Sequence, residues 1–167
     1  PSTGKDHIDT DALKECGIHF ISLNDDRSFI NEITSTAEMN WLLILACMRN
    51  LRDLLDRVQS HKSWVNTDIR GFEMNNKTLG IIGYGRLGKM VARYGKCFGM
   101  RVLAYDTDNN QYDCEVEALG LETLYNVSDV ISLNTKFNPT SANMINMKAL
   151  AMMKQGVVIV NTARGGI

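Results

Sequence analysis

The chain has 167 residues, enough for one full domain with a sizeable core. Hydrophobic residues make up 44% and charged residues 22% of it, and a formal net charge of -1 provides no long-range field to attract nucleic acid or an anionic membrane. No apolar run approaches the roughly 20 residues of a transmembrane helix, and residues 1–10 show no basic-then-apolar signal segment. We therefore expect a cytoplasmic protein that binds neither nucleic acid nor membranes and captures any anion locally.

The first elements are predicted to be short. Asp9 is placed to cap a helix that runs through residues 13–16 and ends at Gly17, which can adopt the left-handed conformation common after a helix. The next apolar run, residues 18–23, is predicted to be a strand, and the polar stretch 24–34 is expected to be irregular.

A long helix is predicted over residues 36–58, because apolar residues recur there at helical spacing and Ser35 and Glu38 have the spacing of a capping box. Its first half is apolar nearly all round, which indicates burial on more than one side. It either crosses between domains or packs against a second copy in a homodimer; a central helix within one domain is an equal alternative. Residues 59–76 are expected to be a polar connector that completes an N-terminal segment, 1–76.

From residue 77 onward, short strands and helices alternate. A strand over 78–82, a helix over 86–98 ended by Gly99, and a strand over 101–105 are predicted to form one βαβ unit. Further buried strands are expected at 130–133 and 157–160, with helical material around 121–127 and 147–153. The alternation predicts an α/β fold over 77–167, with helices on both faces of a doubly wound parallel sheet.

The cysteines and histidines give no sign of a metal or redox site. Cys16, Cys47, Cys97 and Cys114 are widely spaced without a C-x-x-C pair, so we expect buried free thiols rather than disulfides. The three histidines show no helical pairing or thiol neighbours, so no metal is predicted.

A G-x-G-x-x-G motif, formed by Gly83, Gly85 and Gly88, follows the first strand of the βαβ unit and leads into its helix. Gly83 permits the tight turn, Gly85 lets a pyrophosphate approach the backbone, and Gly88 allows the helix to pack closely on the strand. The motif is weak by itself. In this strand–turn–helix context it predicts a Rossmann-type dinucleotide site with the phosphates at the helix N-terminus.

Asp106 ends the second strand, 106 - 88 = 18 residues after the last glycine of the motif. A carboxylate at that distance is placed to accept hydrogen bonds from the adenosine ribose and to repel a 2′-phosphate, so NAD is favoured over NADP. The alternative is a solvated loop acid, which is the role expected of Asp108 and Asp113.

Arg164 follows the last predicted strand, in the segment Asn161-Thr162-Ala163-Arg164-Gly165-Gly166. Ligands of doubly wound sheets lie beyond the carboxyl ends of the strands, and a guanidinium there can hold a carboxylate and polarise an adjacent keto oxygen. An arginine before two glycines is otherwise more often an ordinary loop residue.

At these motifs the sequence resembles the D-isomer-specific 2-hydroxyacid dehydrogenases, the family of D-3-phosphoglycerate, glycerate, D-lactate and formate dehydrogenases. The resemblance runs through nearly the whole chain, and its most specific part is the segment that ends in Arg164-Gly165-Gly166-Ile167. The residues that carry it are 3–9, 36–38, 77–88, 98–100, 128–133 and 161–167.

The resemblance implies a Rossmann-type NAD-binding domain inserted into a smaller catalytic domain built from both ends of a longer chain, in an oxidoreductase of phosphoglycerate or related D-2-hydroxy and 2-keto acids. It places the amides of Arg86 and Leu87 on the pyrophosphate, Asp106 on the ribose and Thr135 near the adenosine. It places Thr162, Ala163 and Arg164 at the nicotinamide half, with Thr3 reaching the same crevice. Arg164 matches the family's catalytic, substrate-binding arginine.

Two departures from the family pattern stand out. The family's His-x-Pro is replaced by Asn134-Thr135-Lys136, which alters one edge of the adenine site. The family's proton-transferring histidine and its acid are expected beyond Ile167, so these 167 residues are expected to be a fragment that is inactive alone. The alternatives are a non-catalytic NAD(H)-sensing protein of the corepressor type and, with less support, a hydrolase or amino-acid dehydrogenase on a similar fold.

Overall fold

The computed structural model describes residues 7–61 and 69–167, which fall into two compact units separated in the sequence between residues 34 and 35. Thr3, predicted at the nicotinamide side, lies outside the described residues, as does the middle of the predicted connector. In the described part of the chain, no helix is long and apolar enough to cross a membrane.

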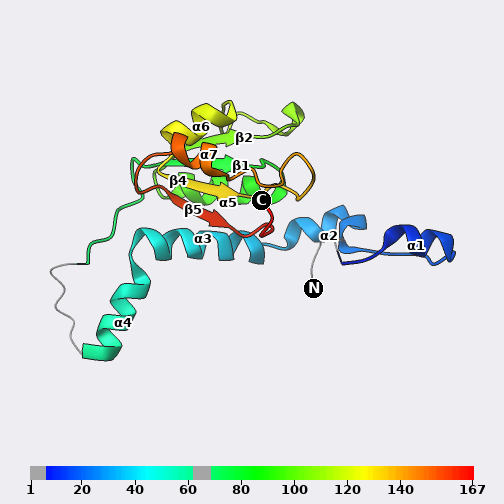
Figure 1. The fold of residues 1–167 in the computed structure, drawn as a ribbon, viewed down its shortest axis with the longest axis horizontal. Helices are drawn as coiled ribbons and strands as arrows, with labels where there is room; N and C mark the ends of the chain where they lie inside the picture. The colour runs from blue at the N-terminus through cyan, green and yellow to red at the C-terminus, as the bar shows by residue number, and fades with distance from the viewer. Residues whose placement is uncertain (1–6, 62–68) are drawn as a thin grey trace. The chain divides into compact units, whose positions relative to one another are not determined.

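The larger unit is built on a five-stranded sheet in which every neighbouring pair is parallel, in the order β3-β2-β1-β4-β5 (Figure 1). The strands are β1 (Thr78–Ile82), β2 (Arg101–Tyr105), β3 (Glu117–Ala118), β4 (Val130–Leu133) and β5 (Val158–Asn161). β1 and β4 are almost wholly buried, as expected of central parallel strands covered on both faces. The sequence prediction missed only β3, a two-residue edge strand with both side chains exposed.

Helices cover both faces of this sheet, so the predicted doubly wound α/β fold is confirmed. One apolar cluster joins α3 (Ser35–Met48) and α5 (Arg86–Cys97) to the side of the sheet that carries Leu79 and Ile81. The other joins α6 (Leu121–Val127) and α7 (Met147–Met152) to the side that carries Ile82 and Ile131. Figure 1 shows α6 and α7 on one side of the sheet and α3 along the other.

The smaller unit differs from its prediction. Asp9 caps α1 (Thr10–Glu15) as expected, accepting from the amides of Asp11 and Ala12. The strand predicted over 18–23 is wrong: Ile18 and Ile21 are exposed, and a short 3-10 helix, η1 (Leu23–Asp25), follows them. A strand needs a neighbour for its backbone groups, and all strands of the described chain lie within 78–161.

The stretch predicted to be irregular, 24–34, also contains a helix, α2 (Arg27–Glu32). Its N-cap is Asp26, whose carboxylate accepts from the Phe29 amide at 3.0 Å. This is a local cap that the sequence prediction did not take into account.

The single long helix predicted over 36–58 is two helices, α3 and α4 (Leu51–His61), and Figure 1 shows the chain turning between them. Asn50 adopts a left-handed conformation (φ 49) and its side-chain amide donates to the Arg70 carbonyl. The Phe72 amide donates to the Met48 carbonyl at 2.7 Å. The segment around 70–72 therefore caps α3 from about 20 residues away in the sequence, which no local pattern could show.

The four cysteines are free but exposed, so the prediction that they are buried is wrong. Cys16 is the C-cap of α1 and Cys97 ends α5, and helix ends lie toward solvent. Cys47 lies on the outer side of α3, whose sheet-facing side is formed by Ala37, Trp41, Ile44 and Met48. In residues 7–61 and 69–167, no group of His, Cys, Asp and Glu is arranged to hold a metal ion.

Candidate functional site

The glycine loop joins β1 to α5 at the point where three strands end. Gly83 has φ +91, and its amide donates to the Tyr105 carbonyl at the end of β2. A Cβ on Gly83 would lie 2.6–2.8 Å from backbone atoms of Asn134 and Thr135, which follow β4. The loop, the end of β2 and the end of β4 are therefore packed backbone to backbone, with no room for a side chain at Gly83.

The other two glycines of the motif have different reasons to be glycine. A Cβ on Gly88 would lie 2.2 Å from the Gly83 carbonyl oxygen, so the fold itself requires Gly88. A Cβ on Gly85 would meet no atom within 4 Å, and its φ of -81 is open to any residue. Nothing in the described protein requires glycine at position 85, whereas a phosphate lying against the backbone does.

Gly85 is the N-cap of α5, and Arg86 and Leu87 form the start of its first turn. Amides in a first turn have no partner within the helix and carry the positive end of its dipole. Partial burial lowers the pKa of the Arg86 guanidinium, as expected for a cation held partly out of water. The start of α5 thus has the geometry and charge that suit a pyrophosphate.

Asp106 is fixed beside this loop at the end of β2. It is half-buried, and its Oδ2 accepts from the Tyr84 amide at 2.7 Å while Oδ1 accepts from the Asp108 amide at 2.9 Å. Asp108, in contrast, is exposed, and its pKa is lowered by hydrogen bonds from Gln111 and Asn110 within its own loop. Asp106 is therefore a constrained carboxylate at the strand end rather than a solvated loop acid.

Tyr84, the variable residue between Gly83 and Gly85, anchors the loop that follows Asp106. Its side chain is 1% exposed, its hydroxyl donates to Asp113 Oδ1 at 2.8 Å, and its ring stacks on Tyr112. Lys89 reaches the other oxygen of Asp113 at 3.3 Å. Burial and the Asp113 carboxylate raise the pKa of Tyr84 far above its ordinary value, so the hydroxyl stays a donor.

Asp113 is exposed, as expected of a solvated loop acid, but sequence reasoning did not find its contact with Tyr84. Burial alone would raise the pKa of Asp113, but hydrogen bonds from the Tyr84 hydroxyl and the Glu115 amide, with Lys89 beside it, hold that pKa below its usual range. Nothing in the spacing of Tyr84 and Asp113 indicated the pair, because α5 and β2 lie between them and Asp113 itself lies in an irregular loop.

The segment that carries Arg164 leaves the same edge of the sheet. Asn161 Oδ1 accepts from the Ala163 amide and Asn161 Nδ2 donates to the Arg164 carbonyl, both at 2.9 Å, so the turn is held by one side chain. Thr162 and Ala163 are half-buried, whereas Arg164 is exposed and its guanidinium donates to the Ala163 carbonyl at 2.9 Å. The turn leaves the Arg164 side chain accessible at the strand end.

The predicted site residues within the described part of the chain therefore gather at the carboxyl ends of four parallel strands. The set comprises Gly83, Gly85, Arg86, Leu87 and Gly88 after β1, Asp106 after β2, Thr135 after β4, and Thr162, Ala163 and Arg164 after β5. Thr135 is half-buried and reaches this edge through its contact with Gly83.

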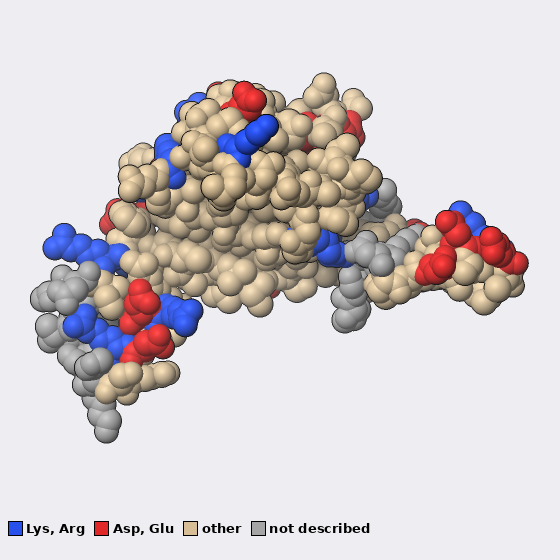
Figure 2. Space-filling view, in the orientation of Figure 1, with Lys and Arg blue, Asp and Glu red and all other residues tan. Residues whose placement is uncertain are grey.

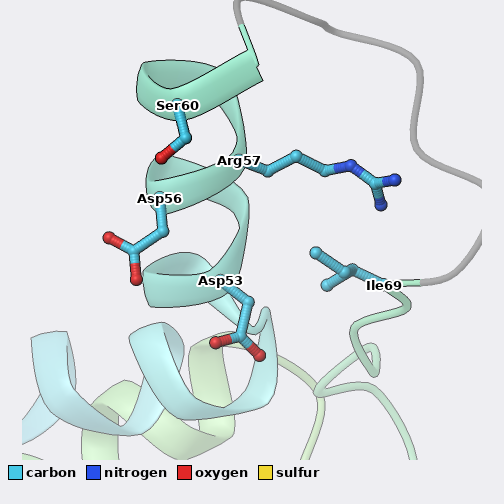
Figure 3. Close-up of a pocket in the computed structure, with 5 residues that line it drawn as sticks. All are labelled: Asp53, Asp56, Arg57, Ser60 and Ile69. Atoms are coloured by element: carbon cyan, nitrogen blue, oxygen red, sulfur yellow. The ribbon is translucent and has the colours of Figure 1, made fainter.

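A hollow of about 340 Å³ lies elsewhere, on α4, and is lined by Asp53, Asp56, Arg57, Ser60 and Ile69. Figure 3 shows Arg57 extending toward Ile69 while Asp56 and Ser60 point away from it. None of the predicted site residues lines this hollow, so it is not part of the predicted dinucleotide site.

Comparison with known protein families matches residues 41–167 to the NAD-binding domain of the D-isomer-specific 2-hydroxyacid dehydrogenases. A hydroxypyruvate reductase of Thermotoga maritima is 38% identical over 163 residues, 98% of this chain and 51% of the relative. A D-3-phosphoglycerate dehydrogenase of Homo sapiens is 32% identical over 99% of this chain and 30% of the relative. The chain thus spans about half the length of the first relative and less of the second.

Solved structures give the same picture. A D-lactate dehydrogenase from Aquifex aeolicus, complexed with NAD and lactic acid, is similar with a TM-score of 0.82 and 37% identity, over 99% of this chain and 49% of that one. The apo-structure of the Escherichia coli D-lactate dehydrogenase is similar with a TM-score of 0.84 and 32% identity, over 98% of this chain and 51% of that one.

Proposed function

Because the chain belongs to the D-isomer-specific 2-hydroxyacid dehydrogenase family, we propose that the protein containing it exchanges hydride between NAD and a small D-2-hydroxy acid. The observation that carries this proposal is Asp106, held beside an open Gly85 at the start of α5. The relatives named above are reductases and dehydrogenases, which favours the enzyme over the NAD(H)-sensing corepressor type.

The roles of the residues on the adenosine side follow from their places. The first-turn amides of Arg86 and Leu87 hold the pyrophosphate, and Gly85 lets it approach. Asp106 accepts from the ribose hydroxyls, and Thr135 lies against the adenosine. A 2′-phosphate at this position would face the carboxylate of Asp106, so NAD is preferred to NADP.

On the nicotinamide side, Thr162 and Ala163 contact the ring, and Arg164 holds the substrate carboxylate and polarises the C2 oxygen. NAD supplies the hydride chemistry when bound. The relatives extend well beyond the matched region, and we place the proton-transferring group outside these 167 residues. These residues alone are then expected to bind NAD without turnover.

The binding test compares two aspartates of one loop by calorimetry. Asp106→Ala should weaken NAD binding at least about tenfold, because a hydrogen bond to a charged group is worth about 1.5–3 kcal/mol. Asp108→Ala, exposed in the same loop, is the control and should leave the affinity unchanged. An unchanged affinity in Asp106→Ala removes that residue from the site.

The activity test follows NADH absorbance with a panel of 2-keto acids, using the full-length protein that contains these residues. Arg164→Ala should lower kcat/KM at least about tenfold and Arg164→Lys should recover little, since a bidentate contact needs the planar guanidinium. Full activity in Arg164→Ala would contradict the role of this arginine.

We also propose a homodimer that forms through α3 and α4. Six of the exposed large apolar side chains lie on these two helices: Met39, Leu42, Leu43, Leu51, Leu55 and Val58. Figure 2 shows the surface over α3 to be largely without charged side chains. An apolar surface of this kind marks an interaction site.

Light scattering tests the dimer. Leu42→Glu should convert the protein to a monomer, whereas Ala151→Glu, which adds the same charge on the exposed side of α7, should leave the dimer intact. A wild-type monomer at high concentration would contradict the proposal.

The cellular location is proposed on the state of the thiols. Exposed free cysteines such as Cys47 and Cys97 persist in the reducing cytoplasm and are oxidised outside it. We therefore assign the protein to the cytoplasm, and fractionation of cells that express the complete gene checks the assignment.

A further inference from the structure

The buried side of α3 carries one polar side chain among apolar ones. Asn40 is 0% exposed and lies beside Trp41, in the helix face completed by Ala37, Ile44 and Met48. A buried amide costs free energy unless its donor and acceptor are both paired. Asn40 therefore needs partners from the sheet below it.

Those partners are two hydroxyl groups far away in the sequence, one in β4 and one just after β5. Asn40 Oδ1 accepts from Ser132 Oγ at 2.9 Å, and Asn40 Nδ2 donates to Thr162 Oγ1 at 2.9 Å. Ser132 lies in the middle of β4 and is fully buried, while Thr162 directly follows β5. Asn40 thus ties α3 to the turn that carries Arg164.

Asn134 extends this network of hydrogen bonds on the far side of Ser132. Its Nδ2 donates to Ser132 Oγ at 2.9 Å, and to the Ser132 carbonyl oxygen at 3.3 Å. A carbonyl can only accept, so it is the NH2 group of Asn134 that faces Ser132. This is the residue that stands where the family has the histidine of His-x-Pro, and it belongs to the buried network.

The NH2 group of Asn134 determines which atom donates and which accepts in the other hydrogen bonds of the network. Ser132 Oγ accepts from Asn134, and its own buried proton needs an acceptor, which Asn40 Oδ1 provides at 2.9 Å. The NH2 group of Asn40 then faces Thr162. Thr162 Oγ1 therefore accepts from Asn40, which leaves the Thr162 hydroxyl proton for an acceptor at the strand edge.

We propose that Asn40 is a positioning residue that presents the Thr162 hydroxyl as a hydrogen-bond donor to the carboxamide oxygen of the nicotinamide. Asn134 fixes the direction of the hydrogen bonds that lead to it. This inference rests on the proposed function, because it requires NAD to lie along the carboxyl edge with its nicotinamide at Thr162.

The test compares NAD with ADP-ribose, which has the adenosine, the pyrophosphate and the second ribose but no nicotinamide. Asn40→Leu should weaken NAD binding about three- to tenfold, the range of one ordinary hydrogen bond, and leave ADP-ribose binding unchanged. Ile44→Val is the control, because it loosens the same buried face of α3 without touching the network and should leave the ratio of the two affinities unchanged.

Asn40→Ser, which is too short to reach Thr162, replaces Asn40→Leu if the latter does not fold, and the same change in ratio is expected. In a Thr162→Val background, Asn40→Leu should cause no further change in the ratio, because Asn40 acts through that hydroxyl. An unchanged ratio of the two affinities, which includes an equal loss of affinity for both ligands, overturns the proposal. Failure of wild-type protein to bind either ligand would instead contradict the proposed function.

Discussion

The βαβ unit, residues 78–105, and the helical segment of α3 and α4 differ in what determines their structure. In the βαβ unit the turns carry local signals: Gly88 packs on the Gly83 carbonyl and Gly99 follows α5 with a positive φ, although the backbone after β4 also closes on Gly83. Between α3 and α4 the turn depends on Arg70 and Phe72, which return from about 20 residues further on. Local sequence signals mark the turns of the first region but not the turn of the second.

The largest effect is expected from Gly88→Ala, which tests whether the βαβ unit depends on this local packing. A Cβ 2.2 Å from the Gly83 carbonyl oxygen forces α5 away from β1, and we expect a loss of about 3 kcal/mol of unfolding free energy. Thermal unfolding should show Tm lowered by about 6–12 °C. Gly120→Ala, with open space around its Cβ, is the control. An equal Tm in both variants would contradict the claim that the βαβ unit depends on the packing of Gly88.

Asn50→Ala tests the long-range turn. Alanine tolerates the left-handed conformation at φ 49 less well than asparagine does, and the substitution also removes the hydrogen bond to Arg70. We expect the unfolding free energy to fall by about 1–2 kcal/mol. Asn50→Gly removes only the hydrogen bond and should lose less, as measured by urea unfolding. If Asn50→Ala were as stable as wild type, α3 and α4 could form one helix and the sequence prediction would have been right in solution.

The smallest effect is expected at Asp129, which joins β4 to β1. Burial alone would raise its pKa, but the Thr78 amide at 2.8 Å and Lys154 at 3.0 Å hold the pKa below its usual range. A lowered folded-state pKa contributes stability above about pH 4 and loses it as the pH falls through the lowered value. Asp129→Asn should cost about 0.5–1 kcal/mol at neutral pH.

The pH dependence separates this interaction from simple packing. The difference in unfolding free energy between wild type and Asp129→Asn should shrink as the pH falls below about 4, measured by urea unfolding from pH 7 to pH 2. A difference that stays constant over that range would show that the charge of Asp129 contributes nothing.

The same contrast separates what the sequence predicted from what it did not. The strands at 78–82, 101–105 and 130–133 were predicted with the bounds that the structure has, because apolar runs and glycines mark them locally. The strand predicted over 18–23 was wrong, since an apolar run alone does not supply the neighbouring strand that it needs.

The residues of the candidate site also divide into those that the local sequence marks and those that only the fold brings together. Asp106 and the glycines were predicted as site residues from their spacing, which follows from the length of one helix and one strand. The Tyr84–Asp113 pair and the contacts of Asn40 were not found, because they join residues 29, 92 and 122 positions apart. Side chains that meet only through the fold leave no periodic signal in a single sequence.

NAD binding by Gly85→Ala tests the central claim most directly. The added Cβ meets no protein atom within 4 Å, so the variant should keep the wild-type Tm, and calorimetry should show NAD binding at least about tenfold weaker because the Cβ lies in the path of the pyrophosphate. Wild-type NAD affinity in a folded Gly85→Ala protein would contradict the claim that the start of α5 holds the cofactor.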